Sequence, residues 1–231
     1  MSIYLLVFML GTSVASFLNV VAKSVPIHQN WWSRRSICPH CHTILTPFQL
    51  IPIFSFLIQK GHCKHCRSKI APSYLFVEIV GGLLFTLPVI YHPIPSFIFL
   101  LHSWLFFSLL LTVTLTDLHY QLIPNKILIA FALPLFLTGG NLLTASIGFF
   151  FFYGVALFGK MLFNKETIGG GDIKLYFVIG LVLPFHPLFL SITISSAVAL
   201  IYLLFSGKNK SLPYAPFIAL GSMVAYLVFI Y

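Results

Sequence analysis

The stretch Gly169-Gly170-Gly171-Asp172-Ile173-Lys174 puts an ionisable carboxylate where a strongly apolar segment begins. The next residues read LYFVIGLVLPF, so Asp172 lies at or just inside a membrane boundary. A carboxylate in that position is costly to desolvate and indicates a functional site. The glycines allow backbone conformations that other residues avoid, and they let another chain approach closely. We therefore expect the protein to be organised around Asp172.

The composition indicates a polytopic membrane protein, because 59% of the 231 residues are hydrophobic and only 7% are charged. A membrane-spanning helix needs about 20 apolar residues. The apolar runs predict an all-α protein with about eight transmembrane helices, the fourth and sixth of them short: 3–21, 73–91, 95–116, 125–138, 142–159, 173–186, 188–205 and 214–231. Lys23 follows the first run and no basic segment precedes it, which favours a retained span over a cleaved signal peptide.

The basic residues predict the orientation. With eight spans, all 13 Lys and Arg residues fall on one side of the membrane, while the connections 92–94, 139–141 and 186–187 carry none. The positive-inside rule makes the charged side cytoplasmic. The net charge of +9 then reports topology and contact with the lipid bilayer, and no nucleic-acid partner is expected. We expect a multi-pass protein of a bacterial inner or plasma membrane.

All four cysteines lie in the segment 22–72, which separates a first transmembrane helix (1–21) from a predicted seven-helix membrane core (73–231). They form two C-x-x-C pairs, typical of a zinc knuckle or ribbon in which each pair supplies two thiolates. The expected ligands of a structural Zn²⁺ are Cys38, Cys41, Cys63 and Cys66. Disulfides are the alternative, but they are rare in a reducing cytoplasm. Four thiolates fill the zinc shell, so the nearby His40, His42, His62 and His65 are expected to be neighbours only.

Asp117 is a second carboxylate at the end of an apolar run, the third one, and eight spans bring it to the same cytoplasmic side as Asp172. An isolated Asp there would be a capping or interfacial acid, but two such acids suggest one site. Two adjacent carboxylates share a proton, so one can activate water while the other polarises a carbonyl, as in aspartic proteolysis. The sequence contains no G-x-S-x-G and no H-E-x-x-H motif, which disfavours serine and zinc proteases.

Three further polar residues have less specific expectations. Glu78, within the second run, either pairs with Lys69 or Arg67 or faces the bundle interior as a partner of the site. His102 is expected to be a hydrogen-bonded structural histidine, and Glu166 to be solvated.

The motifs together resemble those of a bacterial type IV prepilin peptidase, of the leader peptidase/N-methyltransferase family of GxGD aspartic proteases. They run in order along nearly the whole chain: 15–21 (ASFLNVV), the two C-x-x-C pairs, Val77-Glu78, 117–125 (DLHYQLIPN), 169–174 (GGGDIK) and 212–217 (LPYAPF). The resemblance implies a membrane aspartic endopeptidase with Asp117 and Asp172 as the catalytic pair, supported by Gly169, Gly171, Lys174 and Glu78.

The resemblance also implies the substrates and a second activity. Prepilins or pseudopilins would be cut at the cytoplasmic face, between a basic leader and an apolar helix, in the service of a type IV pilus, protein secretion or competence. Family members with this layout often N-methylate the new amino terminus with S-adenosylmethionine, an activity associated with the cysteine-bearing loop. One departure from the family pattern is the glycine at position 170, which is expected to loosen the turn before Asp172. Lys174 is expected to extend its amine to the headgroups.

Two other functions remain open from the sequence. A presenilin-like or preflagellin-type intramembrane protease shares the G-x-G-D pattern, although the tetracysteine segment argues against it. An ion-coupled transporter can also use paired acids and glycine-broken helices. Against the transporter, we find no inverted repeat, and both acids lie at one surface of the membrane.

Overall fold

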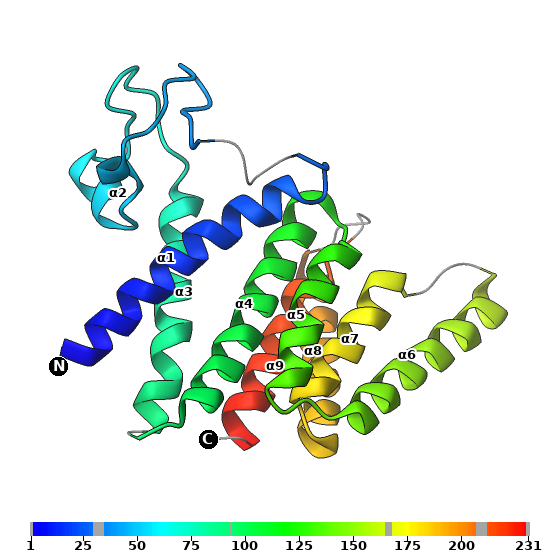
Figure 1. The fold of residues 1–231 in the computed structure, drawn as a ribbon. Helices are drawn as coiled ribbons and strands as arrows, with labels where there is room; N and C mark the ends of the chain where they lie inside the picture. Colours follow the sequence, from blue (N-terminus) through cyan, green and yellow to red (C-terminus); the bar gives the residue numbers. More distant parts are fainter. Residues whose placement is uncertain (1, 30–34, 93, 165–167, 207–211, 230–231) are drawn as a thin grey trace. The chain divides into compact units, whose positions relative to one another are not determined.

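The computed structural model describes residues 2–29, 35–92, 94–164, 168–206 and 212–229, and within them the chain is helical (Figure 1). The elements in order are α1 (Ser2–Ser24), the 3₁₀ turn η1 (Pro47–Leu50), α2 (Phe54–Ile58), α3 (Pro72–Tyr91), α4 (Phe97–Tyr120), α5 (Asn125–Leu137), α6 (Leu142–Phe163), α7 (Gly170–Val182), α8 (Phe185–Ser206) and α9 (Ala215–Phe229). Two isolated β-bridges occur in the segment between α1 and α3. The long helices follow the apolar runs, which confirms the predicted all-α membrane fold.

The helices differ in whether they are long enough to cross a membrane. Among the described residues, five helices are long and apolar enough to cross a membrane, namely α1, α3, α4, α6 and α8. The helices α5 and α7 have only 13 residues each and measure about 20 Å, against a hydrocarbon core of about 30 Å. The sequence explains both lengths. Helix α5 begins after Pro124 and ends before the glycines at 139 and 140, whereas α7 begins within the glycine stretch and ends before Pro184.

The chain divides into two compact units, residues 1–95 and 96–231. In the first unit, α1 packs along α3 at very short range because both helices present small residues. A Cβ added to Gly81 would overlap that of Ala15, and one added to Gly11 would lie 2.7 Å from the carbonyl oxygen of Gly81. Such glycine contacts are a common basis of helix association in membranes.

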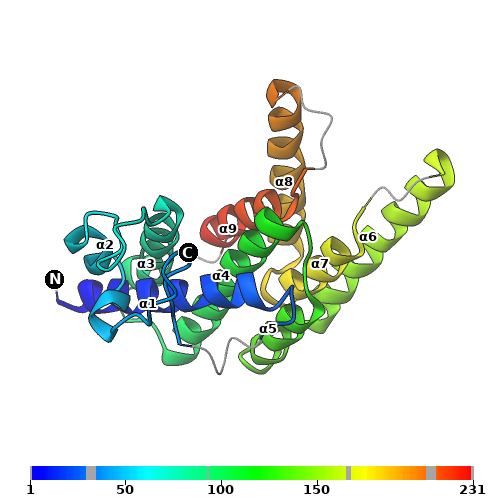
Figure 2. The same ribbon diagram turned by 90° about the horizontal axis from the view of Figure 1, so that it is seen from above.

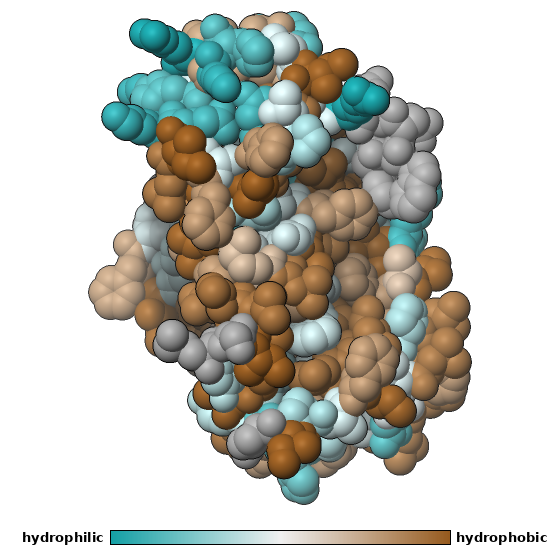
Figure 3. Space-filling view, turned by 60° about the vertical axis from the view of Figure 1, so that its left-hand side comes forward, coloured by the Kyte–Doolittle hydropathy of each residue, from teal (hydrophilic) through white to brown (hydrophobic). Residues whose placement is uncertain are grey.

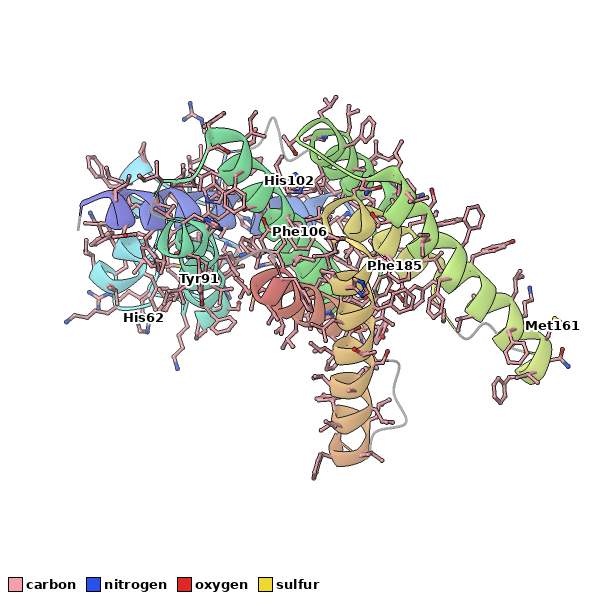
Figure 4. All side chains as sticks on the ribbon, turned by 90° about the horizontal axis from the view of Figure 1, so that it is seen from below. His62, Tyr91, His102, Phe106, Met161 and Phe185 are labelled. Carbon is pink, nitrogen blue, oxygen red and sulfur yellow. The ribbon has the colours of Figure 1, made fainter. Side chains whose placement is uncertain are left out.

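In the second unit, consecutive helices alternate in direction from α4 to α9, so the end of α4 and the first turns of α5, α7 and α9 lie on one side (Figure 1). A buried aromatic cluster joins α4 to α9, with Phe106 and Phe107 against Tyr226 at ring-centroid distances of 5.1 and 5.5 Å. Figure 4 labels Phe106 and His102 on α4. His102 of α4 bonds through Nδ1 to the Thr138 hydroxyl at 2.8 Å, which confirms a hydrogen-bonded structural histidine.

The outer ends of α6 and α8 diverge from the rest of this unit (Figure 2). They carry exposed apolar side chains, including Phe158, Met161, Leu204 and Phe205. Brown, apolar residues also dominate the face seen in Figure 3. In water such a surface would be a liability, whereas in a bilayer it contacts lipid tails.

The α6–α7 contact makes a stability prediction, because it depends on glycine. A Cβ at Gly180 would lie 2.7 Å from the Cα of Ala145 and 2.8 Å from the carbonyl oxygen of Thr144. Gly180→Ala should therefore lower the free energy of unfolding in detergent by about 1–3 kcal/mol. Gly154→Ala in exposed α6 is the matched control: nothing lies within 4 Å of its added Cβ, so stability should be retained or rise slightly. Equal thermal stability of the two variants would contradict the packing.

Candidate functional site

The glycine run and Asp172 form the start of α7. Gly169 is the N-cap residue with φ −65° and ψ 136°, Gly170 is the first helical residue, and Asp172 lies in the first turn. A carboxylate there interacts favourably with the positive end of the helix dipole. None of the three glycines has a positive φ, so the expected need for unusual backbone conformations was wrong. Gly170 is already helical and does not loosen a turn.

Steric crowding explains why two of these three positions are glycine. A Cβ on Gly169 would lie 3.1 Å from Oδ2 of Asp172, and one on Gly171 would lie 3.1 Å from the Cβ of Ile123. Nothing lies within 4 Å of a Cβ added to Gly170. The first and third glycines therefore let the carboxylate and the chain before α5 approach α7, whereas the middle position is unconstrained.

Asp117 lies in the last turn of α4, which ends where Gln121 adopts a left-handed conformation with φ 50°. Only 7% of the Asp117 surface is exposed. Its Oδ2 accepts a hydrogen bond of 2.8 Å from the backbone N–H of Ala215, the first residue of α9. The first N–H groups of a helix have no intrahelical acceptor, so Asp117 caps α9 across 98 residues of sequence.

The two aspartates share one region of the second unit. Ile123, shortly after the end of α4, packs against Gly171, so the end of α4 that carries Asp117 adjoins the start of α7 that carries Asp172. Each carboxylate faces the N-terminus of a helix, Asp117 that of α9 and Asp172 that of α7. Because consecutive helices alternate in direction, the helix ends that carry the two acids lie on one side of this unit (Figure 1). That the two acids form one catalytic site stays a prediction.

Lys174 and Glu78 have partners that sequence reasoning did not identify. The exposed Nζ of Lys174 donates to Oδ1 of Asn125 at 3.0 Å and so links α7 to the start of α5. Glu78 is buried and accepts hydrogen bonds from the Ser16 hydroxyl at 3.0 Å and the Ile53 backbone N–H at 2.8 Å.

Glu78 is therefore bonded to neutral donors, and the expected pairing with Lys69 or Arg67 was wrong. The reason is that α1 packs tightly on α3 and the segment before α2 returns to meet it. Glu78 thus ties the cysteine-bearing segment to the α1–α3 pair within the first unit. Glu166 lies outside the described residues, as do four basic residues of the topology argument, Arg34, Lys165, Lys208 and Lys210.

The two C-x-x-C pairs form two turns of the same design. The carbonyls of Cys38 and Cys63 each accept a 2.9 Å hydrogen bond from the residue four positions later, His42 and Arg67 respectively. Those two residues both have φ 55°. An isolated β-bridge closes each turn, between residues 37 and 44 and between 62 and 69. This repeated turn directs two thiols from each pair toward a common point.

The four sulfur atoms lie within 4.8 Å of one another, and those of Cys38 and Cys66 are 3.9 Å apart. Tetrahedral Zn–S bonds of 2.3 Å place sulfurs about 3.8 Å apart, so the cluster fits a tetrahedral metal ion. The four thiols are free of disulfides. Backbone hydrogen bonds from Cys41 and His40 lower the pKa of Cys38 to about 6, which favours the thiolate that a metal requires.

The four histidines near the pairs do not join this group, because the described cluster that could hold a metal contains only the cysteines. His62, for example, bonds through Nδ1 to the Lys60 carbonyl at 2.7 Å.

Sequence reasoning did not assign a role to the hydroxyls near Asp172. Tyr176 of α7 is fully buried, and its hydroxyl lies 2.8 Å from the Ser195 hydroxyl of α8. The Tyr214 hydroxyl lies 3.3 Å from that of Ser196. The sequence spacing could have identified Tyr176, because it follows Asp172 by four residues and so shares its face of α7.

Two family models match this chain. Residues 9–92 match the bacterial peptidase A24 N-terminal domain, and residues 104–204 match the type IV leader peptidase family. The first region lies within the first compact unit, and the second region lies within the second unit and ends before α9. No solved structure matches the chain.

Curated relatives cover almost the whole sequence. A prepilin leader peptidase/N-methyltransferase of Bacillus subtilis (strain 168) is 38% identical, over 96% of this chain and 93% of its own length. Proteins of the same name from Myxococcus xanthus (strain DK1622) and Aeromonas hydrophila are 31% and 29% identical. These matches cover 78% and 96% of this chain, and 56% and 89% of the respective relatives. With the paired carboxylates and the four-cysteine cluster in the regions that these matches cover, the chain belongs to the type IV leader peptidase family.

Proposed function

We propose that this chain is a membrane aspartic endopeptidase that removes the basic leader from type IV prepilins or pseudopilins. The observation that carries the proposal is the location of Asp117 and Asp172 at two helix N-termini on one side of the second unit (Figure 1). The names of the curated relatives support the same substrate class.

The proposed chemistry uses the two aspartates as one acid–base unit. One carboxylate removes a proton from a water molecule as its oxygen attacks the scissile carbonyl carbon, and the other, protonated, donates to the carbonyl oxygen. The tetrahedral intermediate then collapses with proton transfer to the leaving amine, which becomes the new amino terminus. The N–H of Ala215 fixes Asp117 in this scheme, and no covalent enzyme intermediate is needed.

The site would face the cytoplasm, on the side that carries the basic residues. A prepilin has a basic leader followed by an apolar helix, so its scissile bond lies at the membrane surface. Catalytic groups at helix ends would meet that bond while the leader stays in water and the helix in lipid. A transporter would need its acids nearer the midplane, and membership of a leader peptidase family favours hydrolysis. The match of the cysteine-bearing region to the bacterial A24 N-terminal domain favours this class over a presenilin-like protease.

The four cysteines would hold a structural Zn²⁺. Four thiolates leave no open coordination position, so the metal would stabilise the fold of the segment between α1 and α3 and take no part in hydrolysis. N-methylation of the new amino terminus is the second activity in the relatives' names. We assign it here on that basis, with S-adenosylmethionine as the methyl donor.

Replacing either aspartate tests the pair. Asp117→Asn or Asp172→Asn should lower prepilin cleavage by about 10²- to 10⁴-fold, the usual contribution of a general acid or base, with membrane insertion unchanged. Immunoblots of processed and unprocessed prepilin in cells expressing each variant give the readout. Glu166→Gln makes the same charge change outside the pair and should process normally. Near-normal processing by either Asn variant would end the two-aspartate mechanism.

The two outer positions of the glycine run can be compared with the middle one. Gly169→Ala should reduce the cleavage rate about 10-fold or more, because its Cβ would displace the Asp172 carboxylate. Even a small displacement of a reacting group lowers the reaction rate strongly. Gly170→Ala adds the same methyl group to open space and should cleave at the wild-type rate. Equal rates for the two variants would show that space around Asp172 is not the constraint.

Metal content tests the cysteine cluster. The purified protein should contain about one zinc per chain by elemental analysis, and Cys63→Ser should lower both zinc content and the resistance of residues 35–71 to proteolysis. Asp172→Asn should keep its zinc, since the cluster and the aspartate lie in different units. A folded, active sample without zinc would refute the metal site.

A further inference from the structure

Two hydroxyl contacts join α8 to the helix starts near the two aspartates. Tyr176 on α7 is 0% exposed, and its hydroxyl is 2.8 Å from Ser195 Oγ on α8. The half-buried Tyr214, just before α9, has its hydroxyl 3.3 Å from Oγ of the exposed Ser196. Ser195 and Ser196 are consecutive, so one turn of α8 holds both tyrosines.

The hydrogen bond between Tyr176 and Ser195 has a fixed direction. The single hydroxyl proton of Ser195 points to the backbone carbonyls of Ser191 and Ile192, at 2.7 and 3.0 Å. Ser195 therefore accepts at its oxygen, and Tyr176 donates to it. The backbone of α8 thus orients the Tyr176 hydroxyl.

The two contacts with α8 connect the backbone positions that hold the two acids. Tyr176 follows Asp172 by one helical turn and lies on the same face of α7. Tyr214 immediately precedes Ala215, whose N–H binds the Asp117 carboxylate. A shift of Tyr214 relative to Tyr176 would move the donor of Asp117 relative to Asp172.

We propose that Tyr176 and Tyr214 are positioning residues that hold Asp117 and Asp172 at the separation needed for catalysis. The inference rests on the proposed peptidase function, and it adds two residues to that mechanism. Neither tyrosine needs to exchange a proton with the substrate. Their role is to keep the first turn of α9 in register with the first turn of α7.

Phenylalanine substitutions isolate the hydroxyl groups. The Tyr176 ring stacks on Phe152 with centroids 3.9 Å apart, and Tyr176→Phe keeps that packing. The matched control is Tyr226→Phe: Tyr226 is 1% exposed and bonds to Ser103 Oγ at 2.7 Å. Ser103 lies 14 residues before Asp117 on α4, about 20 Å along the helix. The control therefore removes an equally buried hydroxyl far from the aspartates.

The experiment measures prepilin cleavage by the purified full-length chain in detergent, with kcat, KM, the pH profile of kcat and the thermal unfolding midpoint of each variant. Tyr176→Phe and Tyr214→Phe should each lower kcat about 10-fold or more with KM within about 2-fold. Both should displace the pH profile of kcat, because the shared proton of the aspartates depends on their separation. The double variant should be no slower than the slower single variant, since both break one connection. Tyr226→Phe should match wild type in kcat and pH profile.

Unchanged kcat and pH profiles in both tyrosine variants would overturn the inference, as would an equal loss in Tyr226→Phe. If a tyrosine variant does not fold, Ser196→Ala removes only the outer, exposed partner of Tyr214 and should displace the pH profile in the same direction. An unchanged profile would again overturn the inference.

Asp172→Asn in the same assay keeps the two proposals distinguishable. Cleavage by that variant refutes the peptidase mechanism, whereas an inactive Asp172→Asn beside fully active tyrosine variants refutes the positioning role alone.

Discussion

The hydrogen bond from the backbone N–H of Ala215 to the carboxylate of Asp117 joins the last turn of α4 to the first turn of α9. The N–H groups at the start of a helix need acceptors from outside it, and the neighbouring Pro216 has no N–H to offer. One carboxylate therefore satisfies a requirement of the fold and, in the proposed mechanism, also supplies a reactive group. The location of α9, and with it Tyr214 and the buried contact of Tyr226 with α4, depends on this bond.

The same physical device occurs twice in the second unit, which explains how two acids are accommodated among apolar helices. Asp172 lies in the first turn of α7 and Asp117 faces the first turn of α9, so each carboxylate meets the positive end of a helix dipole. A helix N-terminus can stabilise an anion without introducing a basic side chain into the membrane. The glycines before Asp172 provide the room for this arrangement, because Gly169 faces the Asp172 carboxylate and Gly171 faces Ile123.

Much of this architecture was predictable from local patterns. Apolar runs located the long helices, and the two C-x-x-C pairs identified the four-cysteine cluster. The two acids at helix ends predicted the proposed site. The partners of those groups were not predictable, since they come from residues distant in sequence. Glu78 bonds to Ser16 and Ile53 because α1 and α3 pack through glycines, which no charge pattern reveals. Similarly, the glycine run suggested unusual backbone conformations. The structure instead shows that Gly169 and Gly171 leave room for the Asp172 carboxylate and for Ile123.

The central claim is that Asp117 and Asp172 act together in cleaving a prepilin. Its most direct test is the intact mass of a prepilin after incubation with the purified, detergent-solubilised protein, beside the Asp172→Asn variant. The account predicts loss of the leader mass with the wild-type protein alone, and an added methyl mass when S-adenosylmethionine is supplied. Unchanged prepilin mass with the wild-type protein, across several prepilins, or leader loss with the Asp172→Asn variant, would contradict it.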